Sequence, residues 1–205
     1  INGKEYIVKT IVTTETIKTI AERNGVEMYD VYTGFKWIAN VMRENEGKKN
    51  YIGGGEESYG FLCEDFVRDK DAVSACVILA EIAAWAKDQG LSLYQLLQKI
   101  YVEYGFSKEK GISVVKKGKS GAEEIEAMMK KFRENPLTEI AGSKVTYFYD
   151  YSTLKGKDYA ENETVTLDMP TTSNVLQYFT EDNTKVSIRP SGTEPKIKFY
   201  CEVHS

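Results

Sequence analysis

The chain contains a single histidine, His204, which lies next to the carboxyl terminus. A Ser–His–acid triad therefore has no base within the body of the chain. The three cysteines, Cys63, Cys76 and Cys201, have none of the spacing of a zinc site. Their odd number favours reduced thiols in a cytoplasmic protein over a disulfide framework.

Long apolar runs are also missing. The most apolar stretch, residues 72–86, is interrupted by Ser74 and Glu81 and is shorter than the roughly 20 residues that cross a bilayer. We interpret this stretch as a buried core helix, capped by Asp71, and expect no membrane partner. The net charge of −4, with scattered lysines and arginines, gives no basic surface for nucleic acid. Walker and dinucleotide-binding fingerprints are absent as well.

Hydrophobic patterning divides the sequence into two parts. Up to about residue 104, short strand patterns alternate with amphipathic helix patterns, which predicts an α/β layered domain, a mixed sheet with flanking helices. Residues 105–121 are polar and rich in lysine and glycine, and we expect a linker there. A helix and a run of hairpin strands follow, which predicts a smaller α+β domain with an antiparallel sheet. The predicted domains are residues 1–104 and 105–205.

The first candidate site is the stretch SIRPSGTEPKIKFY, residues 187–200. Arg189 ends an expected strand, and Lys198 lies on the next one. The turn between them carries two hydroxyls and a glycine: Ser191, Thr193 and Gly192. A phosphate dianion needs several converging donors, and a guanidinium fork, two hydroxyls and an open backbone supply them. The alternative is an ordinary hairpin turn in which Arg189 pairs with Glu194.

The second candidate site is IGGGEESYGF, residues 52–61. Three glycines follow an expected strand, and we expect a loop with an accessible backbone. Glu56 and Glu57 place two carboxylates on this loop, with Ser58 beside them. Carboxylates accept paired hydrogen bonds from vicinal hydroxyls, so this chemistry suits a sugar ring. The alternative is a tight turn whose acidic side chains lie in solvent or cap the next element.

The third candidate site is YTGFKW, residues 32–37. We expect Thr33 to be the N-cap of a helix. Gly34 and the N–H groups of the first turn would then form a helix start that is open to an oxyanion. Plain helix capping is the alternative.

The motifs TGFKW, GGGEESYG and RPSGTEPKIKFY, in this order, resemble those of the α-D-phosphohexomutases, the phosphoglucomutase and phosphomannomutase family. The resemblance extends over essentially the whole chain. Members of this family have four domains, and the resemblance implies that this chain comprises the third and the fourth. The start at Ile1 is consistent with the absence of the first helix of the third domain.

The resemblance also implies roles for the candidate residues. Glu56 and Ser58 would bind sugar hydroxyls, with Thr33 and Gly34 beside them. The substrate phosphate that is not transferred would be held by the other group: Arg189, Ser191, Gly192, Thr193 and Lys198. The spacer EESYG is more similar to the phosphoglucomutase branch, and a phosphomannomutase or a phosphopentomutase remains an alternative.

Two motifs of the family have no counterpart in this sequence, the phosphorylated serine and the magnesium loop. The resemblance implies that Mg²⁺ binds outside this chain, and that a hexose 1,6-bisphosphate is the activator. The partners it implies are a phosphosugar substrate and the missing N-terminal domains. We therefore expect a C-terminal fragment, inactive alone, of an enzyme that interconverts hexose 1-phosphate and hexose 6-phosphate through a phosphoserine and a bisphosphate. An independent phosphosugar-binding module and a purely structural α/β protein are the alternatives.

Overall fold

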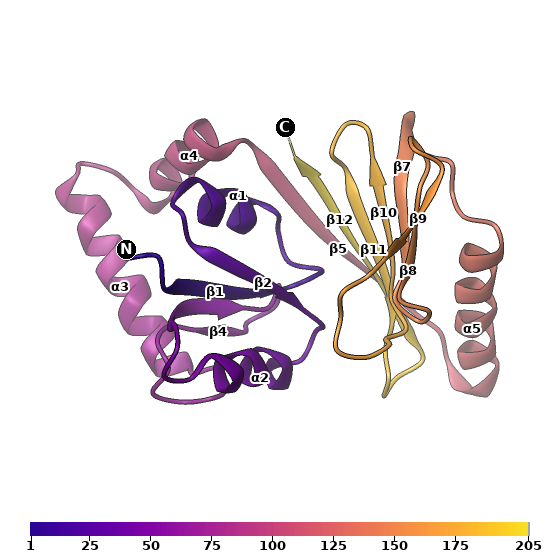
Figure 1. Ribbon diagram of the computed structural model, residues 1–205, viewed down its shortest axis with the longest axis horizontal. Helices are drawn as coiled ribbons and strands as arrows, with labels where there is room; N and C mark the ends of the chain where they lie inside the picture. The colour runs from indigo at the N-terminus through magenta and orange to yellow at the C-terminus, as the bar shows by residue number, and fades with distance from the viewer. Residues whose placement is uncertain (205) are drawn as a thin grey trace. The chain divides into compact units, whose positions relative to one another are not determined.

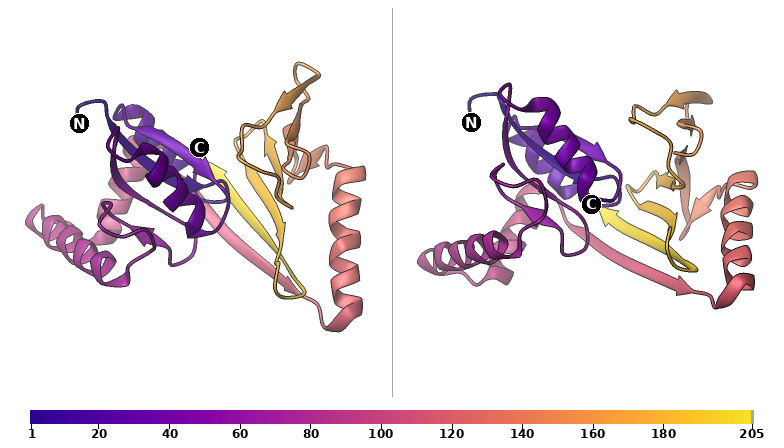
Figure 2. Two further views of the ribbon diagram at one scale, coloured as in Figure 1. Left: turned by 60° about the horizontal axis from the view of Figure 1, so that its bottom comes forward. Right: turned by 90° about the horizontal axis from the view of Figure 1, so that it is seen from below.

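A computed structural model of the protein describes residues 1–204. The chain divides into two compact units, and the division falls between Ser107 and Lys108. Unit 1 is a mixed sheet with helices, and unit 2 is an antiparallel sheet with one helix (Figure 1). Figure 2 shows the same helices and strands in two further views. The predicted fold class, an α/β domain followed by an α+β domain, is confirmed.

The sheet of unit 1 has four strands in the order β2-β1-β3-β4. Their bounds are β1 (Glu5–Thr10), β2 (Glu27–Val31), β3 (Asn50–Gly55) and β4 (Phe61–Leu62). β1 pairs in parallel with β2 and with β3, whereas β4 pairs antiparallel with β3. The carboxyl ends of the three parallel strands therefore lie at one edge of the sheet, where open α/β sheets bind their ligands.

Four helices belong to unit 1: α1 (Thr16–Arg23), α2 (Phe35–Asn45), α3 (Ala72–Asp88) and α4 (Leu93–Tyr104). α1 and α2 lie on opposite sides of the sheet (Figure 1). α2 buries one apolar stripe against Tyr6 and Val8 of β1, formed by Phe35, Ile38, Val41 and Met42. Full burial stabilises each such side chain by about 1.5–3 kcal/mol. This stripe fixes the start of α2, and with it residues 33 and 34, on the sheet.

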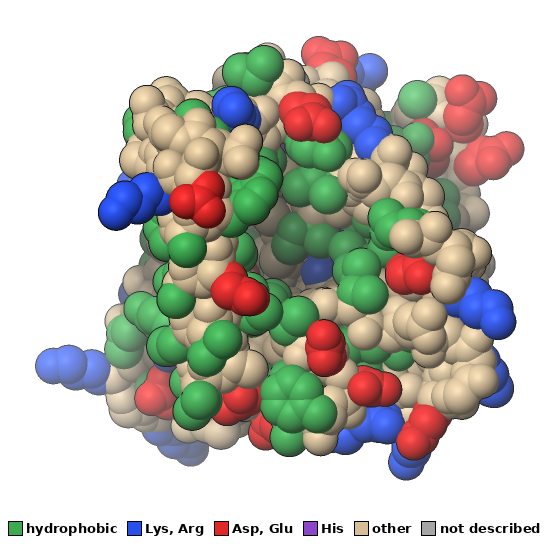
Figure 3. Space-filling view, turned by 90° about the vertical axis from the view of Figure 1, so that its left-hand side faces the viewer, with side chains coloured by type: hydrophobic (Ala, Val, Ile, Leu, Met, Phe, Trp, Pro, Cys, Tyr) green, Lys and Arg blue, Asp and Glu red, His purple; other side chains and the backbone are tan. Residues whose placement is uncertain are grey.

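α3 is not the buried core helix that its composition predicts. Of its residues only Ala86 is buried, and four large side chains are more than half exposed: Val73, Val77, Leu79 and Trp85. Figure 3 shows hydrophobic side chains gathered on this side of the molecule. Composition does not decide burial, because burial also requires a neighbour to pack against. The predicted cap is confirmed, since the Asp71 carboxylate accepts the N–H groups of Val73 and Ser74. None of the described helices is long and apolar enough to cross a membrane.

Unit 2 is built on an eight-stranded sheet with the path β5-β12-β11-β10-β7-β8-β9 and with β6 paired to β7. The bounds are β5 (Ser107–Val115), β6 (Glu139–Ile140), β7 (Ser143–Asp150), β8 (Lys155–Asp158), β9 (Glu163–Thr166), β10 (Leu176–Thr180), β11 (Lys185–Pro190) and β12 (Lys196–His204). The expected linker over residues 105–121 is wrong, because most of it forms β5. Lysine and glycine are tolerated there because β5 is an edge strand that is largely exposed.

A single helix, α5 (Gly118–Glu134), packs on one face of this sheet. Ile125 and Met129 of α5 share a buried cluster with Leu176, Ile188 and Ile197 from three strands. Side chains alternate between the two faces of a strand. Residues one position away from Ile188 and Ile197 therefore project from the face opposite α5.

Candidate functional site

The two candidate segments of unit 1 lie at the carboxyl edge of its sheet. Thr33 and Gly34 follow β2, and Glu56 follows β3. The structure brings these two segments together, because the Gly34 N–H donates a hydrogen bond to Glu56 Oε1 at 2.5 Å. A carboxylate and a backbone N–H that lie 22 residues apart in sequence thus form one cluster. Ser58, the other predicted sugar ligand, is exposed on the turn after Glu56.

The expected N-cap role of Thr33 is wrong. The N-cap of α2 is Gly34, whose φ of 121° is strained for any residue with a side chain, and the helix begins at Phe35. No side chain caps this helix. The unusual backbone at Gly34 allows its N–H to donate to Glu56.

The three glycines before Glu56 do not form the open loop that the sequence predicts. Gly53, Gly54 and Gly55 are the last residues of β3. A Cβ on Gly54 would lie 2.2 Å from the Val8 carbonyl oxygen and 2.8 Å from Tyr51 Oη. A Cβ on Gly55 would lie 2.3 Å from the Gly60 carbonyl oxygen, so Gly54 and Gly55 are needed for close packing, which fixes the start of the turn that carries Glu56.

Residues 56–60 form the turn between β3 and β4. The Glu56 N–H donates to the Gly60 carbonyl at 2.7 Å and closes the turn. A Cβ on Gly60 would lie 2.9 Å from Glu56 Oε2, so the glycine leaves room for the carboxylate. The neighbouring Glu57 is half-buried, and its Oε2 is shielded from solvent without a hydrogen-bond partner in residues 1–204. The turn thus presents one anchored carboxylate and one whose shielded oxygen can accept a donor.

Lys9 is a residue of this edge that the sequence analysis missed. Its side chain is 1% exposed, and its Nζ lies 2.7 Å from Asp30 Oδ1 and 3.1 Å from Glu15 Oε1. Burial alone lowers the pKa of Lys9, but the attraction of the two carboxylates outweighs burial and raises it. Lys9 is also the register partner of Gly55. Its position at the end of a central parallel strand was the available sequence signal.

The predicted phosphate ligands of unit 2 lie on adjacent strands. Arg189 of β11 and Lys198 of β12 are register partners. Both project from the face opposite α5, because their neighbours Ile188 and Ile197 are buried beside α5. Within residues 1–204 neither forms an ion pair, and the Lys198 ammonium lies 5.8 Å from the centre of the Tyr200 ring. Two like charges directly opposite each other are unfavourable unless an anion binds between them.

The turn after Arg189 is closed by its backbone, since the Ser191 N–H donates to the Lys196 carbonyl at 2.7 Å, whereas the bonds to the Ser191 hydroxyl are longer. The Ser191 hydroxyl accepts the N–H groups of Thr193 at 3.4 Å and of Glu194 at 3.3 Å. Gly192 has no atom within 4 Å of an added Cβ. Glu194 pairs with Lys196 at 2.6 Å, and a side-chain hydrogen bond from Lys196 holds the pKa of Glu194 below its usual value. The alternative pairing of Glu194 with Arg189 is therefore wrong.

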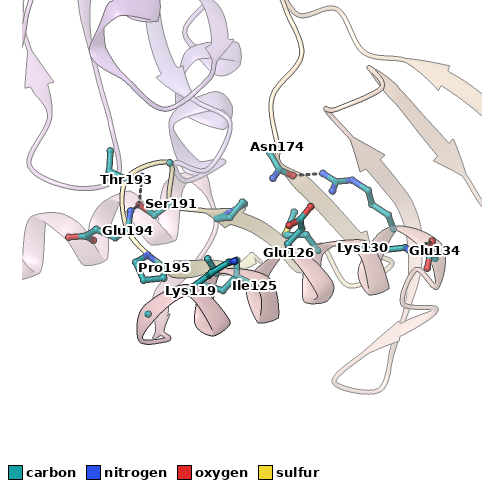
Figure 4. Close-up of a pocket in the computed structure, with 16 residues that line it drawn as sticks. Lys119, Ile125, Glu126, Lys130, Glu134, Asn174, Ser191, Thr193, Glu194 and Pro195 are labelled. Atoms are coloured by element: carbon teal, nitrogen blue, oxygen red, sulfur yellow. Dashed lines mark hydrogen bonds and ion pairs between the residues drawn. The ribbon is translucent and has the colours of Figure 1, made fainter.

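A cavity of about 970 Å³ lies on the other side of this turn, between residues 190–195 and α5. Figure 4 shows Ser191 and Thr193 at one end of the cavity, with Pro195 between them and Lys119 of α5. Neither Arg189 nor Lys198 lines it. Two of its cations are already paired, Lys130 with Glu134 at 3.7 Å and Arg133 with Asp150 at 3.1 Å. Arg189 and Lys198 on the opposite face, by contrast, form no ion pair within residues 1–204.

No group of three or more His, Cys, Asp or Glu side chains within residues 1–204 could hold a metal ion. The resemblance implies that Mg²⁺ binds in another part of the whole enzyme, outside this chain. All three cysteines are free.

Both units of the chain match domain models of one protein family. Residues 1–104 match the family model "Phosphoglucomutase/phosphomannomutase, alpha/beta/alpha domain III", and residues 112–205 match "Phosphoglucomutase/phosphomannomutase, C-terminal domain". The chain belongs to the phosphoglucomutase/phosphomannomutase family.

Individual relatives agree with this assignment. The chain is 40% identical over 197 residues to a phosphoglucomutase of Staphylococcus aureus strain RF122, and 36% identical over 198 residues to that of Staphylococcus haemolyticus. These alignments cover 96% and 97% of this chain but only 35% and 36% of the relatives. The chain thus spans about a third of their length.

Solved structures share the fold. The open form of parafusin, a phosphoglucomutase from Paramecium, is similar with a TM-score of 0.64 at 19% identity, over 97% of this chain and 33% of that one. A phosphoglucomutase/phosphomannomutase family protein from Burkholderia thailandensis has a TM-score of 0.56 at 15% identity, over 98% of this chain and 33% of that one.

Proposed function

We propose that the chain forms the sugar- and phosphate-binding portion of a phosphoglucomutase-type enzyme. The whole enzyme would interconvert hexose 1-phosphate and hexose 6-phosphate through a phosphoserine and a bisphosphate intermediate. In this chain, Glu56 and Ser58 would bind sugar hydroxyls, beside Thr33 and Gly34. The phosphate that is not transferred would bind to five residues of unit 2: Arg189, Ser191, Gly192, Thr193 and Lys198.

The observation that carries this proposal is the cross-strand pair of Arg189 and Lys198. Their side chains share one face of the sheet without a carboxylate partner within residues 1–204. A phosphate between them would neutralise both charges and accept hydrogen bonds from the guanidinium fork. The N–H groups of Thr193 and Glu194 make only long bonds to the Ser191 hydroxyl, so a phosphate oxygen could replace it as their acceptor.

The chain would recognise its ligand and perform no transfer alone. Phosphoryl transfer depends on a positioned nucleophile and on stabilisation of the transferring charge. The residues proposed here hold hydroxyls and one phosphate, and the transferring groups are proposed to lie in the other domains of a longer, cytoplasmic protein. We expect no conversion of glucose 1-phosphate to glucose 6-phosphate by the isolated chain in a coupled assay.

The test is an NMR titration of the ¹⁵N-labelled chain with inorganic phosphate, glucose 1-phosphate and glucose 6-phosphate. Amides of residues 191–193 should respond to all three ligands, and those of residues 56–60 only to the two sugar phosphates. Arg189→Ala should weaken phosphate binding roughly 10- to 100-fold, because a hydrogen bond to a charged group is lost.

Lys119→Ala is the matched control, because Lys119 lines the cavity on the other side of the same turn. We expect phosphate affinity to be unchanged in this variant. If Lys119→Ala loses phosphate binding and Arg189→Ala keeps it, the cavity is the phosphate site and the proposal is wrong. No response at residues 191–193 to millimolar ligand would also contradict it.

A further inference from the structure

Tyr59 occupies an unusual position in the turn of residues 56–60. The hydrogen bond from the Glu56 N–H to the Gly60 carbonyl leaves three residues within the turn, and Tyr59 is the last of them. Its φ of 53° lies in the left-handed region. Hairpin turns of this length place their last residue there, and glycine is the usual choice because it has no Cβ. An aromatic residue at this position carries backbone strain.

Packing does not offset this strain. The side chain of Tyr59 is 105% exposed, and it makes no hydrogen bond or ring contact within residues 1–204. The protein therefore keeps a large aromatic ring in solvent, in a backbone conformation that disfavours it. Backbone strain that is not offset by any contact of the side chain indicates that the side chain has a functional role.

The surroundings of Tyr59 are rigid. The carboxylate of Glu56 is fixed by the Gly34 N–H, and the space that it occupies is kept open by Gly60. Gly54 has no room for a Cβ, which fixes the strand that leads into the turn. The ring of Tyr59 is thus attached to a preorganised turn, one residue after Ser58, and preorganisation lowers the entropic cost of binding.

We propose that Tyr59 is a sugar-binding residue whose ring stacks on the C–H face of the hexose. This inference rests on the proposed function and adds a residue to it. A pyranose presents hydroxyls around its edge and C–H groups on its faces. The carboxylate of Glu56 and the hydroxyl of Ser58 match the edge, and a rigid aromatic ring matches the face. The turn then recognises the sugar itself, whereas unit 2 binds the phosphate.

The test compares the chain with its Tyr59→Gly and Tyr59→Phe variants, with glucose 1-phosphate and inorganic phosphate as separate probes. Tyr59→Gly should bind glucose 1-phosphate roughly 2- to 10-fold more weakly, the range expected for one aromatic contact, and inorganic phosphate equally well. Saturation transfer from aromatic protein protons to the sugar C–H protons should fall in the glycine variant and persist in Tyr59→Phe.

Thermal unfolding separates binding from structure. The melting temperature of Tyr59→Gly should equal or exceed that of the original chain, because glycine relieves the left-handed strain. If the tyrosine stabilised the fold, Tyr59→Gly would have a lower melting temperature than the original chain. Tyr94→Ala removes an aromatic ring that is 69% exposed on α4, and it should leave sugar binding unchanged.

The outcomes distinguish this inference from the proposed function. If residues 56–60 respond to glucose 1-phosphate equally in the chain and in Tyr59→Gly, stacking is refuted and the proposed function stands. If those residues respond to no sugar phosphate in any variant, sugar binding by this turn is refuted and the inference falls with it.

Discussion

The two candidate turns position their binding residues by different physical means. One is the turn of residues 56–60 in unit 1, and the other is the turn of residues 190–195 in unit 2. In the first, backbone atoms leave no room for a side chain at Gly54, and a half-buried carboxylate is tied to a backbone N–H. In the second, Gly192 has open space around it, and the hydroxyl of Ser191 makes only long hydrogen bonds.

This difference matches the two proposed ligands. A sugar offers a fixed array of hydroxyls, so the acceptors that recognise it must themselves be fixed in place. A phosphate is compact and nearly symmetrical, and two cations can hold it without a fixed array of acceptors. Rigidity in unit 1 comes from steric exclusion, whereas the binding proposed for unit 2 relies on charge. The two turns should therefore respond differently to the same kinds of substitution.

The largest expected effect is that of Gly54→Ala. The added Cβ would meet the Val8 carbonyl oxygen at 2.2 Å, and backbone atoms of the central strand would have to move. We expect a loss of about 3 kcal/mol in the free energy of unfolding of unit 1, the upper end for overpacking. Trp37 and Trp85 are the only tryptophans and both lie in unit 1, so denaturant unfolding followed by tryptophan fluorescence measures this loss.

Gly192→Ala is the matched substitution in unit 2. It should change the free energy of unfolding of unit 2, followed by far-UV circular dichroism, by less than about 0.5 kcal/mol. Equal losses for the two variants would show that both turns are sterically fixed, and would remove the distinction between them.

An intermediate effect is expected for the polar anchor of each turn. Glu56→Ala removes the acceptor of the half-buried Gly34 N–H and should destabilise unit 1 by about 1–2 kcal/mol. Glu56→Gln keeps an acceptor and should recover most of this loss. Ser191→Ala removes two long, exposed hydrogen bonds and should cost less than about 0.5 kcal/mol. A larger loss for Ser191→Ala than for Glu56→Ala would reverse the comparison.

Much of the fold was predictable from sequence, because local patterns determined it. The predicted alternation of strands and amphipathic helices in unit 1 is found, and α2 buries one apolar stripe that includes Phe35, Ile38 and Met42. The errors concern context. The segment that forms β5 was predicted to be a linker, because an exposed edge strand can be as polar as a linker. The segment that forms α3 was predicted to be buried from its apolar composition, but composition does not show whether another element packs against the helix.

The candidate site was predictable in its residue types but not in its connections. The motifs placed Glu56, Gly34 and Arg189 among the candidates, yet nothing local indicates that the Gly34 N–H meets the Glu56 carboxylate. Lys9 was missed because its partners Asp30 and Glu15 lie on other segments. Contacts of this kind depend on how the strands are ordered in the sheet.

The smallest expected effect is a change in the pKa of Glu194, and it tests which cation lies beside this carboxylate. The hydrogen bond from Lys196 lowers the pKa of Glu194 below 4.5, so its carboxyl signal should titrate below that value in a ¹³C NMR experiment. A depressed folded-state pKa means that the interaction is present above pH 4.5 and is lost as the pH falls through the lower value. Lys196→Gln should move the midpoint back towards 4.5, and Arg189→Gln should leave it nearly unchanged. The opposite result would pair Arg189 with Glu194 and would remove the free guanidinium on which phosphate binding is proposed to depend.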